Sequence, residues 1–482
     1  MRYVNHVSGA WIALSQWTTQ GFFYPPLEFD GNYGGTRFGP LAIALQAGAH
    51  WLSGDPIVGA KLLHAIYVVA IIFGIWTLLG PLNLPRHLRL FLSVSVLMSP
   101  IGWEAGLAIR HDGLATALQL WAVILVARQS KHPWFMVVLV AMLATLAVLA
   151  KLSALWGGAA CMFYLAWTAP KKLFIYIPTG LVMMACGLGL VEWFSGGYFF
   201  ENMAVCLFPS GGVSQGMDRH TVIHVCKFFL KTMITDPLLL LMVIFSVAGI
   251  WRGWRVAPHF VIAYILVCFM SVYLLTRNGI DRNHLIDFLV VSALGAGLFL
   301  SGRTNQGAKP RGEKLKPGPV THGAGPVQRG WVLAALLAAS LLYVVLPKHH
   351  NGTWFNRPRA VQKSVATLLG ADPPIAVLEQ FGPDDKVISF NPAVPVLLGQ
   401  NPVVIDSWML RVYFEQDREA EAEFVRRVQA QEFDAFVFSF DVGEGLDFAD
   451  EHFGALTLDA VRQNYRLDEV GAFAVFRPIP RD

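Results

Sequence analysis

Long apolar runs recur between residues 59 and 347 and are separated by short segments that carry charge, glycine or proline. A helix needs about 20 apolar residues to cross a bilayer, and the runs are close to that length. Lys151 interrupts the longest run, so we expect a tight turn there between two helices. The pattern predicts ten spanning helices, near residues 59–80, 87–105, 112–128, 134–150, 152–169, 173–193, 236–252, 257–276, 284–301 and 331–347.

The segment Met1–Asp55 precedes these runs and is broken by several prolines and glycines. It lacks the basic stretch and apolar core of a signal peptide. Two parts of it, Tyr3–Trp17 and Phe38–Leu52, have the pattern of amphipathic helices. Because their Trp and Tyr residues suit the headgroup region, we expect both helices to lie in the membrane interface.

The tail from about residue 350 has a different pattern, rich in acidic residues and built of short alternating runs. Glu415–Ala430 has the pattern of a polar amphipathic helix, and Val387–Phe390, Val403–Asp406, Ala435–Phe440 and Ala472–Arg477 look like strands. This alternation predicts a small α/β domain. The tail contains no dinucleotide fingerprint, P-loop or nucleophile elbow.

The composition also indicates a membrane protein. Hydrophobic residues make up 55% of the chain and charged residues 15%, with a mean hydropathy of +0.49, whereas soluble domains have about 25% charged residues. The net charge of +4 gives no indication of a nucleic-acid partner. We therefore predict an α-helical polytopic membrane protein of about ten spans with a small C-terminal α/β soluble domain. Its predicted parts are a first extracytoplasmic loop (1–58), a membrane domain (59–301), a flexible cytoplasmic linker (302–330), a last membrane helix (331–347) and an extracytoplasmic α/β domain (348–482).

Lys and Arg residues lie in alternate loops, which the positive-inside rule assigns to the cytoplasm. The linker 302–330 is also basic and agrees with this assignment. The opposite side then holds Met1–Asp55, Arg110, Lys151, the loop Phe194–Asp236, the turn Arg277–His284 and the C-terminal tail. We expect it to be the periplasmic side of a bacterial inner membrane. The basic residues of the cytoplasmic loops are Arg86, Arg89, Arg128, Lys131, Lys171, Lys172, Arg252 and Arg255.

Carboxylates, bases and imidazoles gather on the predicted outer side. Arg110, His111 and Asp112 lie together at a membrane boundary, where charges are costly unless they are paired, solvated or used. Asp112 also suits the start of the following helix as a cap, and the two roles do not exclude each other. Ordinary polar loops would explain Asp218–His220 but not Lys151, which has apolar neighbours on both sides. The other members are Asp30, Arg37, Glu104, Asp281, Arg282, Asn283, His284 and Asp287.

Transfer of a sugar from a lipid phosphate fits this set of side chains. A carboxylate can deprotonate the acceptor hydroxyl, and Lys, Arg or a divalent metal can neutralise the leaving phosphate. Interfacial helices can hold the lipid chain. Such a donor contains no soluble nucleotide, which agrees with the missing nucleotide motifs.

Four stretches of the sequence form a pattern that resembles a known superfamily. In chain order they are the first loop with Arg2-Tyr3, Gly21–Pro26 and Arg37–Leu41, then Arg110–Leu114, then Leu149–Ser153, and last Gly279–Asp287. They are similar to the first outer loop, second acidic motif, Lys turn and late Asn-Tyr/His segment of the GT-C superfamily, the polyprenyl-phosphate-sugar-dependent glycosyltransferases. The nearest branch contains protein O-mannosyltransferases, lipid A aminoarabinose transferase and the lipopolysaccharide-core galacturonosyltransferases.

The resemblance implies a polyprenyl-phosphate-linked sugar as donor, a glycan, lipid or protein as acceptor, and inversion at the anomeric carbon. It assigns catalysis to Asp112, with Asp30 as a second candidate. Asp112 is also the candidate ligand for a divalent metal, Mg or Mn. Contacts to the donor phosphate fall to Arg110, His111, Lys151, Asn283 and His284, and contacts to the acceptor or sugar fall to Asp287 and Arg37.

The sequence departs from this superfamily at its start. Relatives carry a first helix and an acidic pair just before the Arg-Tyr, whereas here only Met1 precedes Arg2 and Tyr3. Three explanations are open: a start further upstream, an inactive protein, or substitution by Asp30. We favour the first, which would add a helix, make eleven spans and place the N-terminus in the cytoplasm.

Two other function classes remain as alternatives. A transporter would show internal repeats and polar groups at mid-depth, but no convincing repeat is present and the charges lie at one face. A non-catalytic scaffold of envelope polysaccharide assembly would explain the missing acidic pair. Cys206 and Cys226 share one outer loop and could form a disulfide there.

Overall fold

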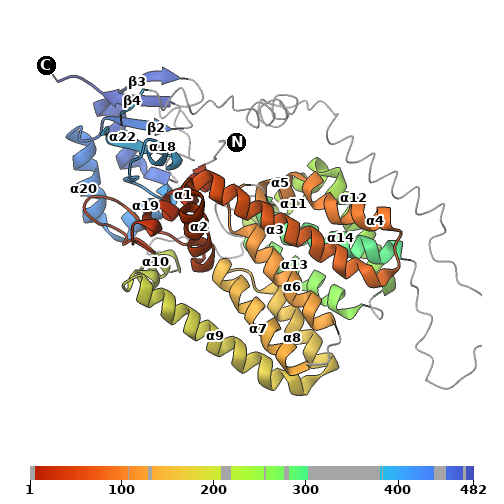
Figure 1. Ribbon diagram of the computed structural model, residues 1–482. Coiled ribbons are helices and arrows are strands. Elements are labelled where there is room, and N and C mark those ends of the chain that lie inside the picture. The colour runs from red at the N-terminus through yellow and green to blue at the C-terminus, as the bar shows by residue number, and fades with distance from the viewer. Residues whose placement is uncertain are drawn as a thin grey trace, which may run out of the picture.

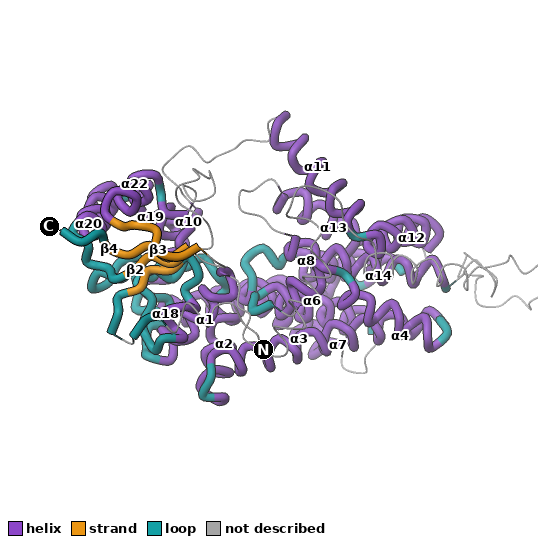
Figure 2. Tube along the Cα trace, turned by 90° about the horizontal axis from the view of Figure 1, so that it is seen from above, coloured by secondary structure: helices purple, strands orange, loops and turns teal. Residues whose placement is uncertain are grey.

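The computed structural model describes a helical domain followed by a small α/β domain (Figures 1 and 2). The strands lie together at one end of the molecule, and the helical domain extends away from them. The predicted fold class is therefore confirmed. The described residues are 6–106, 108–128, 133–207, 219–253, 257–275, 282–301, 380–382, 384–438, 452–470 and 474–481, so the predicted linker 302–330 and last helix 331–347 lie outside them.

Helices occupy nearly all of the predicted apolar runs and both predicted interfacial stretches. The interfacial stretches are α1 and α2, and the tight turn predicted at Lys151 separates α7 from α8. The helices of this domain are α1 (His6–Thr19), α2 (Pro40–Ser53), α3 (Pro56–Leu79), α4 (Arg86–Val94), α5 (Pro100–Gly106), α6 (Asp112–Ala127), α7 (Pro133–Ala150), α8 (Trp156–Thr168), α9 (Leu173–Phe194), α10 (Tyr198–Leu207), α11 (Arg219–Thr235), α12 (Pro237–Gly253), α13 (Pro258–Leu275) and α14 (Ile286–Leu300), with the short 3-10 helices η1 (Gly80–Leu82), η2 (Ser95–Met98), η3 (Pro170–Lys172) and η4 (Arg282–Leu285).

One predicted span is wrong. The range 87–105 is not a single helix, because α4 ends at Val94 and α5 begins at Pro100, with η2 between them. Pro100 cannot donate the main-chain hydrogen bond that a continuous helix would need. At the start of η2, the hydroxyl of Ser95 donates to the carbonyl of Leu92 at 2.7 Å. Apolar content alone did not reveal this break.

The segment predicted as an outer loop, 194–236, also differs from expectation, since it contains α10 and α11. The chain bends by 106° between α11 and α12. Asp236 lies at this bend, where its carboxylate accepts the amide of Leu239 and caps α12, and also accepts the hydroxyl of Ser99. The described cysteines form no disulfide, so the pairing of Cys206 with Cys226 is absent.

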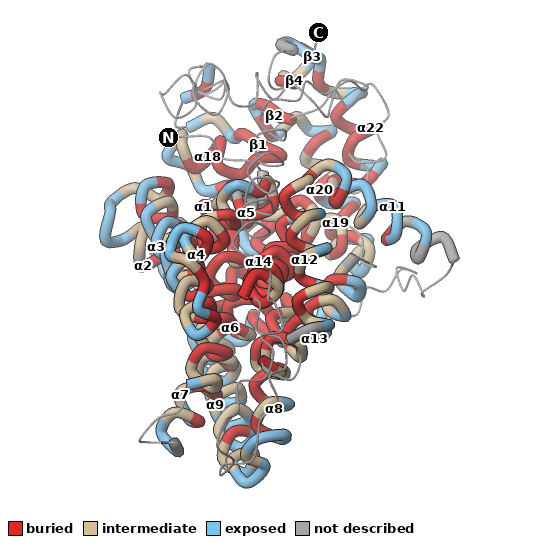
Figure 3. Tube along the Cα trace, turned by 90° about the vertical axis from the view of Figure 1, so that its right-hand side faces the viewer, coloured by how far each residue is buried: buried red, intermediate tan, exposed pale blue. Residues whose placement is uncertain are grey.

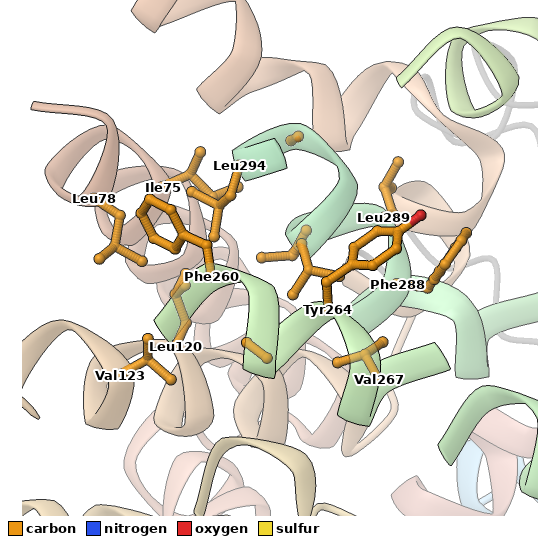
Figure 4. Close-up of a cluster of buried hydrophobic side chains, with 14 of the residues drawn as sticks. Ile75, Leu78, Leu120, Val123, Phe260, Tyr264, Val267, Phe288, Leu289 and Leu294 are labelled. Atoms are coloured by element: carbon orange, nitrogen blue, oxygen red, sulfur yellow. The ribbon is translucent and has the colours of Figure 1, made fainter. Parts of the chain in front are cut away.

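The core of the helical domain surrounds α14. Apolar side chains from α3, α6 and α13 pack against it, among them Ile75, Leu120, Phe260 and Tyr264 (Figure 4). Helices α12 and α14 approach most closely at Gly249 and Gly295, where an added methyl group would meet the facing helix within about 2.3 Å. Small residues at such crossings let backbones approach, as is usual for helices packed in a membrane. Figure 3 shows the resulting buried centre around α12 and α14.

The outer surface of this domain is apolar. Large apolar side chains exposed along α3 form one stripe, made of Val58, Leu62, Ile66, Val69 and Phe73. In an apolar 18-residue stretch of the segment Pro170–Phe194, which contains α9, only 6% of the residues are buried. An exposed stripe of this kind fits contact with lipid. In the described part of the chain, three helices are long and apolar enough to cross a membrane, or four if the bent pair α11–α12 is one span. Helices α6, α7 and α13 are apolar but shorter.

The C-terminal domain is a four-stranded sheet in the order β1-β2-β4-β3. Strands β1 and β2 are parallel, and the other neighbouring pairs are antiparallel. Two predictions are wrong. The segment Val403–Asp406, predicted as a strand, forms only an isolated bridge with Tyr33. The single helix predicted at Glu415–Ala430 is interrupted at Asp417, whose carboxylate caps α20. The elements are β1 (Val387–Ser389), α18 (Ala393–Leu397), α19 (Ser407–Gln416), α20 (Arg418–Gln429), β2 (Ala435–Phe438), α22 (Ala455–Asn464), β3 (Tyr465–Val470), which was not predicted, and β4 (Ala474–Pro478).

Residues 20–39, which connect α1 to α2 and are called the first loop from here on, pack against this C-terminal domain. The main chain of Tyr33 bonds to Val403 at 2.7 Å and to Ile405 at 3.1 Å, and its ring packs edge-on against Phe414 and Phe424. Burial raises the pKa of the Tyr33 hydroxyl to about 12. The loop therefore ties the membrane-proximal helices α1 and α2 to the C-terminal domain.

A second contact holds the tip of the same loop. The guanidinium of Arg427 donates to the carbonyl of Gly31 at 2.6 Å and to Glu432 at 2.8 Å. These bonds to Arg427 lower the pKa of Glu432 to about 2. At the base of the loop, Asn202 of α10 accepts the amide of Thr36 at 2.5 Å.

Replacing Tyr33 by Ala should weaken this attachment. The substitution removes a ring from the core of the C-terminal domain, and such changes cost about 3–5 kcal/mol. Thermal unfolding in detergent should show a lower midpoint, and limited proteolysis should release the C-terminal domain sooner. Tyr33→Phe keeps the ring and is the control. Equal behaviour of Tyr33→Ala and the parent protein would show that the loop does not fasten the domain.

Candidate active site

A buried ion pair joins Asp112 to Lys151. The ammonium nitrogen of Lys151 lies 2.6 Å from Oδ1 of Asp112 and 3.1 Å from Nδ1 of His284. The amide of Asn283 donates to Oδ2 of Asp112 at 2.8 Å. Side-chain exposure is 7% for Lys151 and 0% for Asp112. The structure thus brings together four of the predicted site residues, which come from the start of α6, the turn after α7 and the segment before α14.

Asp112 is positioned by the turn between α5 and α6. The amide of Ile109 donates to the hydroxyl of Ser8 in α1 at 3.2 Å. The amide of Arg110 donates to Nε2 of His64 in α3 at 2.8 Å. Asp112 is the first residue of α6, but no side-chain capping bond is present at that end, so the cap predicted for it is not formed. Its carboxylate faces Lys151 and Asn283 instead.

Lys151 is positioned by the tight turn that follows α7. Its amide bonds to the carbonyl of Ala147 at 2.9 Å, and its carbonyl accepts the amide of Ala154 at 2.7 Å. Gly39 packs directly against this turn, because a methyl group added there would lie 2.0 Å from the carbonyl oxygen of Ala150. The first loop therefore reaches from the C-terminal domain to the backbone beside Lys151.

The remaining predicted charges lie around this pair. The hydroxyl of Thr116, one turn further along α6, donates to the carboxylate of Asp287. Asp287 is close enough to Lys151 and Asp112 to interact with both electrostatically. Arg110 is buried, with 6% exposure, and acts electrostatically on His284. Two carboxylates and two cations are therefore present, and their formal charges balance.

An aromatic wall borders this group. The rings of Trp11 and Phe38 stack with centroids 4.5 Å apart, and the Trp11 ring lies 5.2 Å from that of His111. Within the described part of the chain, Nε1 of Trp11, Nδ1 of His111 and Oδ1 of Asn283 are buried without a hydrogen-bond partner. Buried polar atoms usually have partners, so these atoms are candidates for contact with a ligand. Trp11, Ser8 and His64 have no unusual sequence context, so the sequence did not predict them as site residues.

Arg37 lies between this group and the C-terminal domain. Its guanidinium is 3.7 Å from the ring centre of Trp408, a cation–π contact. It acts electrostatically both on His111 and on His452, which bonds to Ser407 at 2.9 Å. Burial of the imidazole is the main cause that lowers the pKa of His452 to about 4, and the positive charge of Arg37 adds to it.

The structure places Asp30 elsewhere. Asp30 is exposed at the tip of the turn formed by Phe29 and Asn32, in a left-handed conformation with φ of 49°. The following residue, Gly31, contacts Arg427 of α20. Asp30 is thus brought to the C-terminal domain rather than to Asp112. The side chains of Glu104, Asp218 and Asp281 lie outside the described residues.

The donor set does not fit a divalent metal. Both oxygens of Asp112 already accept hydrogen bonds, one from an ammonium group that would repel a cation. No group of three His, Cys, Asp or Glu side chains suited to a metal ion occurs among the residues that the structure describes.

Solved membrane proteins share this fold. ArnT from Cupriavidus metallidurans in the apo state matches with a TM-score of 0.61 at 12% identity, over 97% of this chain and 92% of that one. The same protein bound to undecaprenyl phosphate gives a TM-score of 0.56 at 13% identity, over 98% and 93% of the two chains.

A third solved structure also shares the fold. The archaeal oligosaccharyltransferase AglB from Archaeoglobus fulgidus, in complex with an inhibitory peptide and a dolichol-phosphate, gives a TM-score of 0.50 at 12% identity, over 99% of this chain and 71% of that one. No family model matches the sequence, and no curated protein matches it. The fold is GT-C-like, as the sequence predicted.

Replacing Lys151 by Met should destabilise the helical domain, because it leaves the carboxylate of Asp112 buried without its cation. Breaking one side of a buried pair costs about 3–5 kcal/mol. Adding Asp112→Asn removes the stranded charge, so the double variant should unfold at a higher temperature than the single one. Unfolding in detergent, followed by fluorescence, measures both.

Lys171→Met is the matched control for that experiment, since Lys171 is exposed in η3. Exposed substitutions usually change stability by about 0.5 kcal/mol or less. If Lys151→Met were equally harmless, the ion pair would not be a structural requirement.

Proposed function

We propose that this chain is an integral membrane glycosyltransferase. It transfers a sugar from a polyprenyl-phosphate donor to a glycan, lipid or protein acceptor of the cell envelope, at the outer face of the membrane. The observation that carries this proposal is the buried group of Asp112, Lys151, Asn283 and His284 within a GT-C-like fold. ArnT has been solved with undecaprenyl phosphate and AglB with a dolichol-phosphate, which supports a polyprenyl-phosphate ligand here.

Lys151 is suited to hold the donor phosphate. An ammonium group has three N–H donors, and two of them point to Asp112 and His284. The third remains for a phosphate oxygen. Asp112 and His284 keep the ammonium in place, while Arg110 adds a second positive charge beside it. When the sugar leaves, charge grows on the phosphate, and fixed cations stabilise that charge most in a buried site.

Asp112 is the candidate catalytic carboxylate. A carboxylate has about four lone-pair sites, and the structure uses two of them, for Lys151 and Asn283. A further site can accept the proton of the acceptor hydroxyl as its oxygen bonds to the anomeric carbon and the bond from that carbon to the phosphate oxygen breaks. A single displacement of this kind inverts the anomeric carbon. Asp287 and Arg37 are the candidates for contact with the sugar or the acceptor.

Lys151→Met should lower transfer about tenfold to hundredfold. It removes one charge-assisted contact to phosphate, worth about 1.5–3 kcal/mol. Asp112→Asn should also lower transfer, because the amide keeps the shape of the side chain but cannot take up the proton. The assay measures release of sugar from undecaprenyl-phosphate-linked aminopentose, hexose and uronic acid, with extracted envelope glycolipid as acceptor.

The outcomes of this assay distinguish the alternatives. Lys171→Met should transfer as well as the parent protein. Normal transfer by both site variants, at normal expression, would rule out the site. If the parent protein turns over none of the donors but moves a labelled solute across proteoliposome membranes, the chain is a transporter.

Removing divalent metal should leave transfer unchanged within about twofold. The reason is the ammonium group of Lys151 at 2.6 Å from Asp112, which would repel a second cation there. Dialysis against EDTA followed by the same transfer assay tests this expectation. Loss of transfer that Mg²⁺ or Mn²⁺ restores would make Asp112 a metal ligand and contradict the arrangement described above.

A further inference from the structure

His64 lies in the first half of α3, a largely apolar helix that also contains Lys61, and is 2% exposed. A buried imidazole is unfavourable there unless its nitrogens have partners. Nδ1 lies 2.7 Å from the carbonyl of Ala60, one turn earlier in α3. Nε2 lies 2.6 Å from the carbonyl oxygen of Arg110 and 2.8 Å from its amide nitrogen.

Every partner of this ring is a main-chain group, and those of Nε2 belong to the turn that carries Asp112. With the proton on Nδ1 donated to Ala60, Nε2 accepts the amide of Arg110. With the proton on Nε2, it donates to the carbonyl of Arg110. Either form fixes Arg110, two residues before Asp112.

Main-chain bonds to neighbouring helices help to hold this turn. It lies between α5 and α6 and is buried, so its main-chain groups need partners inside the protein. Ser8 of α1 provides one, to Ile109. Without His64, the main chain of Arg110 would lose its bond to α3. The backbone that carries Asp112 would then be held less firmly, although its carboxylate still contacts Lys151 and Asn283.

We propose that His64 is a positioning residue that holds the Arg110–Asp112 turn in the geometry required for transfer. This inference rests on the proposed function of Asp112. His64 acts through the backbone of Arg110 and does not contact the donor. The ring of Tyr67 contacts the imidazole in a T-shaped arrangement, with ring centroids 5.3 Å apart.

Two substitutions separate positioning from packing. In His64→Gln the terminal amide reaches the position of Nε2 and can bond to Arg110. In His64→Asn the shorter amide reaches only the position of Nδ1, next to Ala60. Both replace a ring by a smaller polar chain, so their packing defects are similar. His87→Asn, at an exposed position in α4, is the surface control.

The experiment has two readouts on the full chain in detergent. Hydrogen–deuterium exchange of peptides covering 108–115 should rise in His64→Asn and stay near the parent level in His64→Gln. In the transfer assay, kcat per folded protein should fall about tenfold for His64→Asn, with KM for the undecaprenyl-phosphate-linked donor unchanged, because Lys151 stays in place. His64→Gln should keep kcat within about twofold.

Each outcome decides the proposal. Faster exchange and lower kcat in His64→Asn alone support it. If both variants only lower the unfolding temperature, without the exchange difference or the kcat difference, His64 is a packing residue and the proposal is overturned. If the exchange difference is present but the parent protein transfers no sugar, His64 does hold the turn and the proposed function is the part that fails.

Discussion

The buried pair of Asp112 and Lys151 is the interaction on which the arrangement of this site depends. Two opposite charges with side-chain exposures of 0% and 7% cannot be separated without leaving one of them desolvated and alone. The pair therefore fixes the turn after α7 against the start of α6. Asn283 and His284 complete the hydrogen bonds, which brings the segment before α14 to the same place. Three parts of the chain that are distant in sequence are joined by a few polar bonds among apolar helices.

The first loop connects the turn at Lys151 to the C-terminal domain. Gly39 lies against the carbonyl of Ala150, next to Lys151, because only a residue without a side chain can approach so closely. Six residues earlier, Tyr33 is part of the core of the C-terminal domain, and Arg37 rests on Trp408. A short stretch of chain thus connects the C-terminal domain to the turn at Lys151. The domain helps to build the site.

Low identity to proteins of the same fold is understandable in physical terms. Helices that face lipid require apolar side chains of many kinds, and packing between them requires small residues only at crossings such as Gly249 and Gly295. Many different sequences meet both requirements. This fold can therefore be shared with ArnT at 12% identity.

The sequence alone predicted the helical membrane domain, the two interfacial helices, the turn at Lys151 and the α/β tail, because apolar periodicity and charge placement act locally. It placed Arg110, Asp112, Lys151, Asn283 and His284 on one side of the membrane, since charges in apolar surroundings are conspicuous. It failed at 87–105, where a proline and two serines break an apolar run, and at Val403–Asp406, whose β-like residues pair with the first loop rather than with the sheet.

Only the tertiary structure decided how the site residues are used. The ion pair of Asp112 and Lys151 joins residues 39 positions apart, and the bond from Asn283 to Asp112 spans 171. No local pattern encodes such distances. In the folded chain Asp30 lies away from Asp112, and His64 lies next to Arg110. From the sequence, Asp30 in its loop was a stronger site candidate than a histidine within a largely apolar helix. Hydrophobic pattern is a property of each segment, whereas the pairing of buried polar groups depends on which segments meet.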